Sequence, residues 1–408
     1  MRTKAFQGLV PDPKHVEEVA TVPYDVVNTE EARALAAGRP HDLLHVDRAE
    51  IGLPAGTDPY SDVVYETARK QFLALQEKGI LQREAKPCVY VYQQIMGEHR
   101  QTGIALACHI DDYGNNIIRK HEKTRPVKED DRTRLVDTLS AHTGPIFLTY
   151  KDRYQINAIV EQVQVNDEPV YRVTDEREVE HIVWRVIDCD ALIDQFDQVP
   201  LSYVADGHHR SASAWRVGSE RRAASTNHTG DEGYNWFLGV LFPGSQLKIL
   251  GYHRIVKDLA GLSKEEFLAK LGEVATVEPT ERQNPFSPGE TCMYLDNAWY
   301  SIQWPACTSQ SPIEKLDVSA LQQHALEPLL GIKNVRTDSR IDFVGGIRGT
   351  GELEKRVDTG NWAVAFSMYP VTVEQLIEIA DANEIMPPKS TWFEPKLRSG
   401  LFINTIDS

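Results

Sequence analysis

Cysteine is scarce and scattered in this chain of 408 residues. Its five cysteines are Cys88, Cys108, Cys189, Cys292 and Cys307. No two of them form a C-x-x-C pair, which excludes zinc-knuckle and thioredoxin-like motifs. An odd and scattered set is typical of small buried side chains in an intracellular protein. We therefore predict buried thiols rather than a disulfide framework.

Long apolar runs and several familiar catalytic motifs are also missing. No stretch of eighteen apolar residues occurs, so no membrane-spanning helix is predicted. The opening residues Met1–Phe6 lack the apolar segment of a secretory signal. We therefore expect a cytoplasmic protein without a membrane partner. The absence of G-x-x-x-x-G-K-[ST], G-x-S-x-G and H-E-x-x-H argues against P-loop, α/β-hydrolase and zincin chemistry.

Positive charge is in deficit. Lys and Arg number 44 against 60 Asp and Glu, a formal net charge of −16. Affinity for nucleic acid comes largely from neutralising phosphates, so a large DNA-binding face is disfavoured. The charge balance favours a small-molecule partner.

The chain is long enough for more than one domain, and its 41% hydrophobic and 25% charged residues are typical of a folded enzyme. Alternating apolar patterns predict strands and amphipathic patterns predict helices along its whole length. We predict an α+β (mixed α/β) fold in three parts. They are an N-terminal α/β part that contributes to the site (1–150), a phosphate-binding core (151–260) and a C-terminal α/β part with a site-lining tail (261–408).

The strongest functional signal lies in residues 201–215. An apolar strand runs into Asp206 and Gly207, and then into an alanine-rich helix that opens with His208, His209 and Arg210. A helix N-terminus binds phosphate through its backbone N–H groups and partial positive charge. Gly207 permits close backbone approach, Arg210 can bind phosphate in bidentate fashion, and Asp206 can hold a metal ion or take a proton.

A purely structural interpretation of this segment stays open. Asp206 can cap the helix, and the two histidines can be polar surface residues. We favour a functional site because two adjacent histidines and an arginine occupy a single helix start.

Two further clusters carry chemistry. Residues 121–134 combine a histidine with acids and bases, including Glu122, and Pro126 interrupts the run. This mix suits a metal–phosphate site, although charge runs are often solvated helix faces. Lys389, Ser390 and Thr391 follow two prolines and can clamp phosphates, with a packed tail as the alternative.

Asp25 follows a strand-like segment and is a candidate general base, or else an ordinary turn aspartate. Residues 217–232 are rich in Arg, Ser, Thr and Gly. We predict a mobile insertion there.

The sequence resembles the domain-of-unknown-function family numbered one thousand and fifteen, sometimes labelled ParB-like. The resemblance covers nearly the whole chain and depends on five blocks in one order: Val22–Val27, His121–Pro126, Thr143–Phe147, Asp206–Arg210 and Pro387–Thr391.

The block Asp206–Arg210 is also similar to the nucleotide-phosphate motif of the ParB/sulfiredoxin superfamily, whose members include free serine kinases with a D-G-H-x-R block. The resemblance implies a ParB/sulfiredoxin-like nucleotide-binding core with additional α/β segments. It implies that Gly207, His208, His209 and Arg210 hold phosphate and that Asp206 assists metal binding or proton transfer. Because family members are often encoded beside serine-biosynthesis enzymes, it also suggests serine or phosphoserine as substrate.

The sequence departs from the superfamily at two points. Sulfiredoxin needs a cysteine in its motif where His208 stands, and a partition protein needs a DNA-binding module and positive charge that this chain lacks. The kinases use a catalytic glutamate, for which Asp25 and Glu122 are the candidates here.

These observations lead to an enzyme hypothesis. We expect a nucleotide-dependent phosphotransferase that uses ATP, ADP or another nucleotide with Mg²⁺ and acts on an alcohol such as free serine. Asp206 and Glu122 are the expected metal ligands. The alternatives are a phosphoserine phosphatase and a non-catalytic nucleotide sensor.

Overall fold

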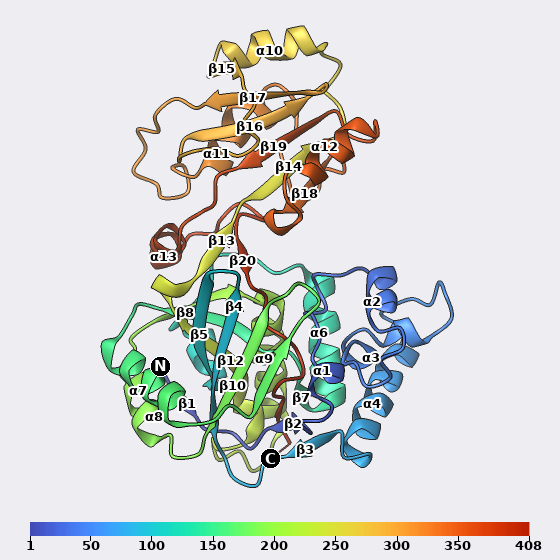
Figure 1. Ribbon diagram of the computed structural model, residues 1–408, viewed down its shortest axis with the longest axis vertical. Coiled ribbons are helices and arrows are strands. Elements are labelled where there is room, and N and C mark those ends of the chain that lie inside the picture. The colour runs from blue at the N-terminus through green and yellow to red at the C-terminus, as the bar shows by residue number, and fades with distance from the viewer. Residues whose placement is uncertain (408) are drawn as a thin grey trace. The chain divides into compact units, whose positions relative to one another are not determined.

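The computed structural model describes residues 1–407 and divides into two compact units, each coloured by residue number in Figure 1. The first unit holds Met1–Lys120, Thr124–Leu247 and residues 395–407, and the second holds His121–Lys123 and Lys248–Glu394. Both units combine helices with sheets, which confirms the predicted mixed α/β class.

A nine-stranded sheet forms the centre of the first unit. Eight of its strands lie in the order β6 (Ile118–Arg119), β11 (Ser202–Asp206), β8 (Ile146–Tyr150), β12 (Trp236–Pro243), β5 (His99–His109), β4 (Val89–Met96), β10 (Glu180–Val186) and β9 (Tyr171–Thr174). The ninth, β1 (Thr3–Lys4), pairs with β5. The pairs β6–β11 and β8–β12 are parallel and the rest are antiparallel. The central strands are buried on both faces, which explains their nearly continuous apolar sequences.

Helices complete two hydrophobic cores in this unit. α7 (Tyr154–Asn166) and α8 (Asp190–Asp197) contribute to the core that contains the sheet residues. A second core joins α3 (Leu44–Asp47), α4 (Asp62–Glu77) and α6 (Pro126–Leu139). The remaining elements of the unit are the helices α1 (Val16–Val19), α2 (Thr29–Leu35), α5 (Ile110–Gly114) and α9 (His208–Ala224), the short 3₁₀ turns Ala49–Gly52, Gly233–Asn235 and Gly244–Gln246, and the strand pairs β2 (Leu9–Pro11) with β3 (Leu81–Arg83) and β7 (Ala141–His142) with β21 (Asn404–Thr405).

An antiparallel six-stranded sheet forms the second unit. Its strands lie in the order β15 (Thr276–Pro279), β17 (Ala298–Gln303), β16 (Glu290–Leu295), β19 (Val364–Met368), β14 (Tyr252–Val256) and β18 (Ile341–Gly345). The unit also contains β13 (Lys248–Leu250) paired with β20 (Trp392–Glu394), the 3₁₀ turn Gly346–Arg348, the π-helix Gln322–Leu326, and the helices α10 (Lys264–Gly272), α11 (Asp317–Leu321), α12 (Gly351–Asp358) and α13 (Val373–Asp381).

Local sequence signals explain several element boundaries. Asn28 caps α2 and forms a capping box with Glu31, as the acidic first turn indicates. The β16–β17 hairpin turns at Asp296 and Asn297, whose φ angles of 48° and 57° are those of a type I′ turn. These signals succeed because each depends on neighbours along the chain.

The predicted mobile insertion at 217–232 is wrong in its first half. α9 continues to Ala224, and its end is held by charged side chains. Arg221 pairs with Asp137 at 2.9 Å, and Arg222 donates to the Asn235 side chain at 2.8 Å. These arginines anchor the helix to other elements. The composition of residues 217–232 alone does not show which distant residues they bind.

The predicted interruption at Pro126 is also wrong. Pro126 is the first residue of α6, a position where proline is favoured because that residue's N–H has no intrahelical acceptor.

Four of the five cysteines are buried as predicted, whereas Cys307 is exposed. Within residues 1–407, no helix has the length and apolar character that crossing a bilayer requires.

Candidate functional site

The candidate site is centred on the turn between β11 and α9. Strand β11 pairs with β8 and has a bulge between Val204 and Asp206, a feature that often re-aims a side chain beside a functional site. Gly207 then takes a φ of +93°, and α9 begins at His208. The first turn of a helix presents backbone N–H groups without intrahelical acceptors. The predicted strand–turn–helix is therefore confirmed.

The guanidinium of Arg210 packs directly against Gly207. A Cβ atom built on Gly207 would lie 3.2 Å from both Cζ and Nε of Arg210. Glycine is therefore favoured here for two reasons: the backbone is left-handed, and a Cβ atom would press on the Arg210 guanidinium.

Arg210 is held in place by backbone and carboxylate oxygens. Its Nη1 donates to the Pro145 carbonyl, and its Nη2 lies 3.9 Å from Asp25 Oδ2 and 3.8 Å from Asp206 Oδ2. Burial alone would lower the pKa of Arg210, but Asp25 and Asp206 outweigh it and raise that pKa. The buried Nε atom has no hydrogen-bond partner within the described chain. One donor of this guanidinium is therefore buried without a hydrogen bond to the described residues.

Asp206 is an ionised carboxylate next to a second cation. Lys396 Nζ lies 3.3 Å from Asp206 Oδ2. Burial would raise the pKa of Asp206, yet Lys396 and Arg210 together hold it well below its usual range. The Asp206 side chain remains 27% exposed, so a bound ion can reach it.

The two adjacent histidines have different surroundings. His208 is buried, and burial lowers its pKa to about 4, so that its imidazole is neutral at pH 7. His209 Nε2 accepts a hydrogen bond of 3.0 Å from the backbone N–H of Arg125 at the start of α6. His209 therefore holds two helix starts together, which is a positioning role.

A buried group of charged residues that the sequence did not single out lies beside Arg210. Arg132 pairs with Asp131 at 2.9 Å, donates to the Asp47 carbonyl at 3.1 Å and stacks 4.0 Å from the Tyr24 ring centroid. The Asp47 carboxylate accepts a hydrogen bond from Thr143 Oγ1, and burial raises its pKa. Arg132 and Arg210 line one small cavity of about 30 Å³, together with Tyr24, Asp47, Thr143 and Gly144 among others. Such a volume holds one or two water molecules.

The other predicted site residues are distributed over both units. Asp25 lies in the first unit, in a turn rather than after a strand, with its side chain 32% exposed. Glu122, Lys389, Ser390 and Thr391 belong to the second unit. There His121 Nε2 lies 3.3 Å from Thr391 Oγ1, and Ser390 Oγ donates to the Pro387 carbonyl at 2.7 Å. Lys389 Nζ is 5.5 Å from the Tyr252 ring centroid.

The structure therefore groups the predicted residues into two sets. Asp25, Asp206 and Arg210 contact one another within the first unit, with His208 and His209 beside them on α9. The block that contains Glu122 and the block that contains Lys389–Thr391 come together within the second unit. Asp47 was missed, whereas Arg132 was singled out only as part of the mixed-charge run 121–134.

Fold and site together define a mixed α/β protein with a charge-balanced polar site at a strand-to-helix turn. Residues 3–319 match the family described as protein of unknown function (DUF1015), and the chain belongs to this family. The expected family is therefore confirmed. No curated protein sequence matches the chain.

Three solved structures show distant similarity. A free serine kinase in complex with AMP matches with a TM-score of 0.37 and 13% identity, covering 73% of this chain and 92% of the kinase. A conserved hypothetical protein from Pyrococcus furiosus has a TM-score of 0.36 and 13% identity, with 72% and 93% covered. SbnI from Staphylococcus aureus, truncated at its C-terminus, has a TM-score of 0.36 and 12% identity, with 72% and 85% covered.

The packing of Arg210 on Gly207 predicts a specific loss of stability. We expect Gly207→Ala to lower the free energy of unfolding by roughly 2–3 kcal/mol, because it combines left-handed strain with displacement of a buried guanidinium. Gly38→Ala is the matched control, since Gly38 has a φ of +76° with nothing within 4 Å of its Cβ position. In chemical denaturation, the free energy of unfolding of that variant should fall by only roughly 1 kcal/mol. Equal losses in the two variants would contradict the packing argument.

The burial of His208 predicts a pH dependence of stability. Because its folded pKa of about 4 is lower than its ordinary value, the unfolded chain binds the extra proton as the pH falls below 6.5. The free energy of unfolding should therefore fall between pH 7 and pH 5, with up to about 2 kcal/mol from this residue. In His208→Gln this part of the loss should disappear, whereas His99→Gln in the β4–β5 hairpin should retain it. A His208→Gln profile identical to the wild type would refute the assignment.

Proposed function

We propose that this protein is a nucleotide-dependent small-molecule phosphotransferase with an alcohol as acceptor, and that free serine is the first acceptor to test. The observation that carries the proposal is the pairing of two cations, Arg210 and Lys396, with two carboxylates, Asp25 and Asp206, at the start of α9. The first turn of that helix adds its partial positive charge.

This arrangement suits a metal–phosphate ligand better than a bare anion. The four charged groups balance, so an added phosphate alone would leave excess negative charge among side chains that are mostly buried. A nucleotide phosphate that arrives with Mg²⁺ brings both signs, and each sign meets a group of opposite charge. The guanidinium of Arg210 and the exposed edge of Asp206 are the groups that fit such a pair.

Each residue then has a role in binding or proton transfer. Arg210, Lys396 and the backbone N–H groups of the first turn of α9 hold the phosphate, and Asp206 holds the metal, which neutralises charge on the transferring group. The acceptor hydroxyl attacks the terminal phosphorus, its proton passes to a carboxylate, and the shortened nucleotide leaves with the bridging oxygen. Asp25 is the proton acceptor that the first unit supplies.

In this scheme His208 and His209 do not take part in the reaction but support the residues that bind the ligand. A neutral imidazole adds no positive charge beside Asp206, so that the carboxylate can bind a cation. His209 fixes the start of α6, the helix that carries Arg132.

We expect phosphoserine to form when the protein is incubated with ATP or ADP, Mg²⁺ and serine, as detected by ³¹P NMR and mass spectrometry. Arg210→Gln should reduce turnover by about 10³-fold, because a charge-stabilising donor is lost. Arg216→Gln is the matched control, since Arg216 lies on the same helix but pairs with Asp130 and Glu220 at the surface. Its turnover should equal that of the wild type.

Other outcomes separate the competing functions. Nucleotide binding that Arg210→Gln weakens, without turnover of any nucleotide, would favour the sensor. Hydrolysis of added phosphoserine without transfer would favour the phosphatase. If Arg210→Gln left nucleotide affinity unchanged, the proposed phosphotransferase and both alternatives, the sensor and the phosphatase, would lose their basis.

A further inference from the structure

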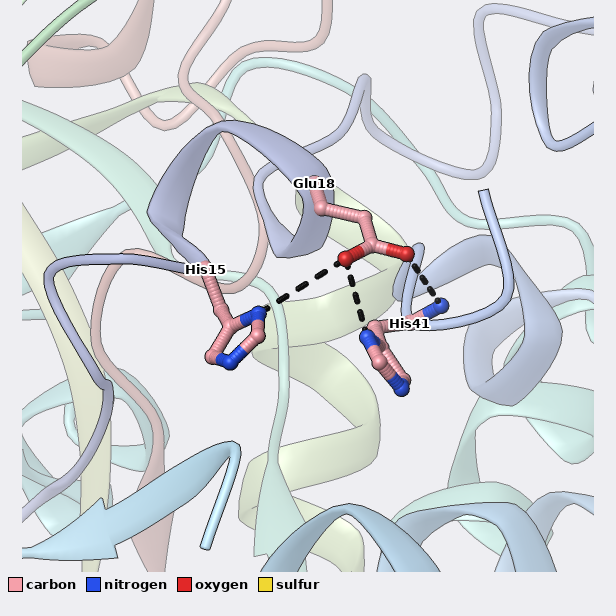
Figure 2. Close-up of side chains that lie close together, drawn as sticks. All are labelled: His15, Glu18 and His41. Carbon is pink, nitrogen blue, oxygen red and sulfur yellow. Dashed lines mark hydrogen bonds and ion pairs between the residues drawn. The ribbon is translucent and has the colours of Figure 1, made fainter. Parts of the chain in front are cut away.

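A second cluster of ligating side chains lies on the N-terminal segment of the first unit. His15 and Glu18 come from the start and the body of α1, and His41 comes from the loop before α3. Figure 2 shows both imidazoles directed at the Glu18 carboxylate. These residues belong neither to the Asp206–Arg210 turn nor to the second unit. The cluster therefore needs an explanation of its own.

The distances within the cluster are compatible with a metal site. Glu18 Oε2 lies 2.9 Å from His41 Nδ1 and 3.7 Å from His15 Nδ1, and the ligand atoms all lie within 4.8 Å of one another. Two atoms bound to one tetrahedral Zn²⁺ at about 2.0–2.1 Å are separated by about 3.3 Å. The two distances lie on either side of this value, so small side-chain rotations would complete the coordination.

Hydrogen bonding alone does not explain the position of His15. The contact between His41 and Glu18 is an ordinary hydrogen bond at 2.9 Å. His15 Nδ1, at 3.7 Å from the same oxygen, is too far away for one. At this separation one Zn²⁺ ion can contact both atoms from the side, at about 2.0–2.1 Å from each.

The backbone around the cluster is fixed by contacts of its own. Glu18 Oε1 accepts from the His41 backbone N–H at 3.3 Å, which leaves Oε2 as the oxygen directed at the two rings. Arg39 Nη2 donates to the carbonyls of Glu17, Glu18 and Ala20 at 2.8–3.2 Å and so ties the loop to α1. The positive charge of Arg39 is offset by Asp42 at 3.3 Å. Pre-oriented ligands of this kind are typical of metal sites with a supporting outer shell.

The cluster is open to solvent on one side. The side chains of His15, Glu18 and His41 are 36%, 27% and 20% exposed. An ion can therefore enter from solution, and a water molecule can complete its coordination. Two imidazole nitrogens and one carboxylate oxygen with an open position form a ligand set that Zn²⁺ favours, whereas Mg²⁺ and Ca²⁺ favour oxygen ligands.

We propose that His15, Glu18 and His41 form a Zn²⁺ site that joins α1 to the loop before α3. The ion stabilises the N-terminal segment and takes no part in phosphoryl transfer. This site is independent of the function proposed above, because it shares no residue with it.

Zinc binding to the full-length chain tests the proposal directly. Protein treated with EDTA and dialysed should bind one Zn²⁺ in calorimetric titration, and bound Co²⁺ should give the visible absorption of a tetrahedral site. His15→Ala, Glu18→Gln and His41→Ala should each weaken Zn²⁺ binding by more than about tenfold, since loss of even an outer-shell partner has that effect. Zn²⁺ should also raise the Tm of the wild type but not of these variants.

His45→Ala is the matched control, because His45 lies four residues after His41 on α3 but outside the cluster. It should bind Zn²⁺ like the wild type. Circular dichroism without metal checks that every variant is folded. No Zn²⁺ binding by the wild type, unchanged binding in His15→Ala, or an equal loss in His45→Ala would each overturn the proposal. Serine phosphorylation plays no part in this test, so its failure and that of the proposed function are distinguishable.

Discussion

The candidate site depends on the guanidinium of Arg210, which packs directly against Gly207. The turn brings the arginine back over the end of β11, and the Pro145 carbonyl at the entrance of β8 accepts a hydrogen bond from it. Two neighbouring strands and one helix start therefore meet at a single side chain. The Asp206 carboxylate then has a fixed positive charge beside which it remains ionised, and Asp25 lies 3.9 Å from the same guanidinium.

Burying so much charge has a cost that the fold has to offset. Arg132 and Arg210 line the same small cavity, and each has carboxylates nearby. Removing one member of such a set leaves an uncompensated charge in a region of low dielectric, which destabilises a protein more than the pair stabilises it. Stability alone would be served equally well by apolar side chains. A cavity lined by Arg132 and Arg210 is therefore consistent with a binding role.

Structural features that depend on residues close together in the sequence could be predicted from it, whereas features that depend on distant residues could not. The strand–glycine–helix within residues 201–215 is set by residues close in sequence and was predicted, and the capping box at Asn28 and the Asp296–Asn297 hairpin are equally local. Asp47 carries no local signal, because it becomes notable only when Arg132 and Thr143 fold against it from about a hundred residues away. The same limitation explains the error at 217–224, where Arg221 and Arg222 find distant acceptors. Residues 121–123 and 386–391 likewise come together in the second unit through long-range contacts, such as that of His121 with Thr391, which the sequence does not predict.

One stretch of the N-terminal segment connects the histidine cluster with the candidate site. α1 carries Glu18, and seven residues later Asp25 faces Arg210. Between them, Thr21 exchanges two backbone hydrogen bonds with Ser399, at 3.0 and 3.1 Å. This bridge fixes the chain at a point between the two features, so a shift of α1 when an ion binds is not transmitted rigidly to Asp25. A metal there acts on the stability of α1 and the loop before α3, while the charges around Arg210 keep their positions through β8, β11 and α9.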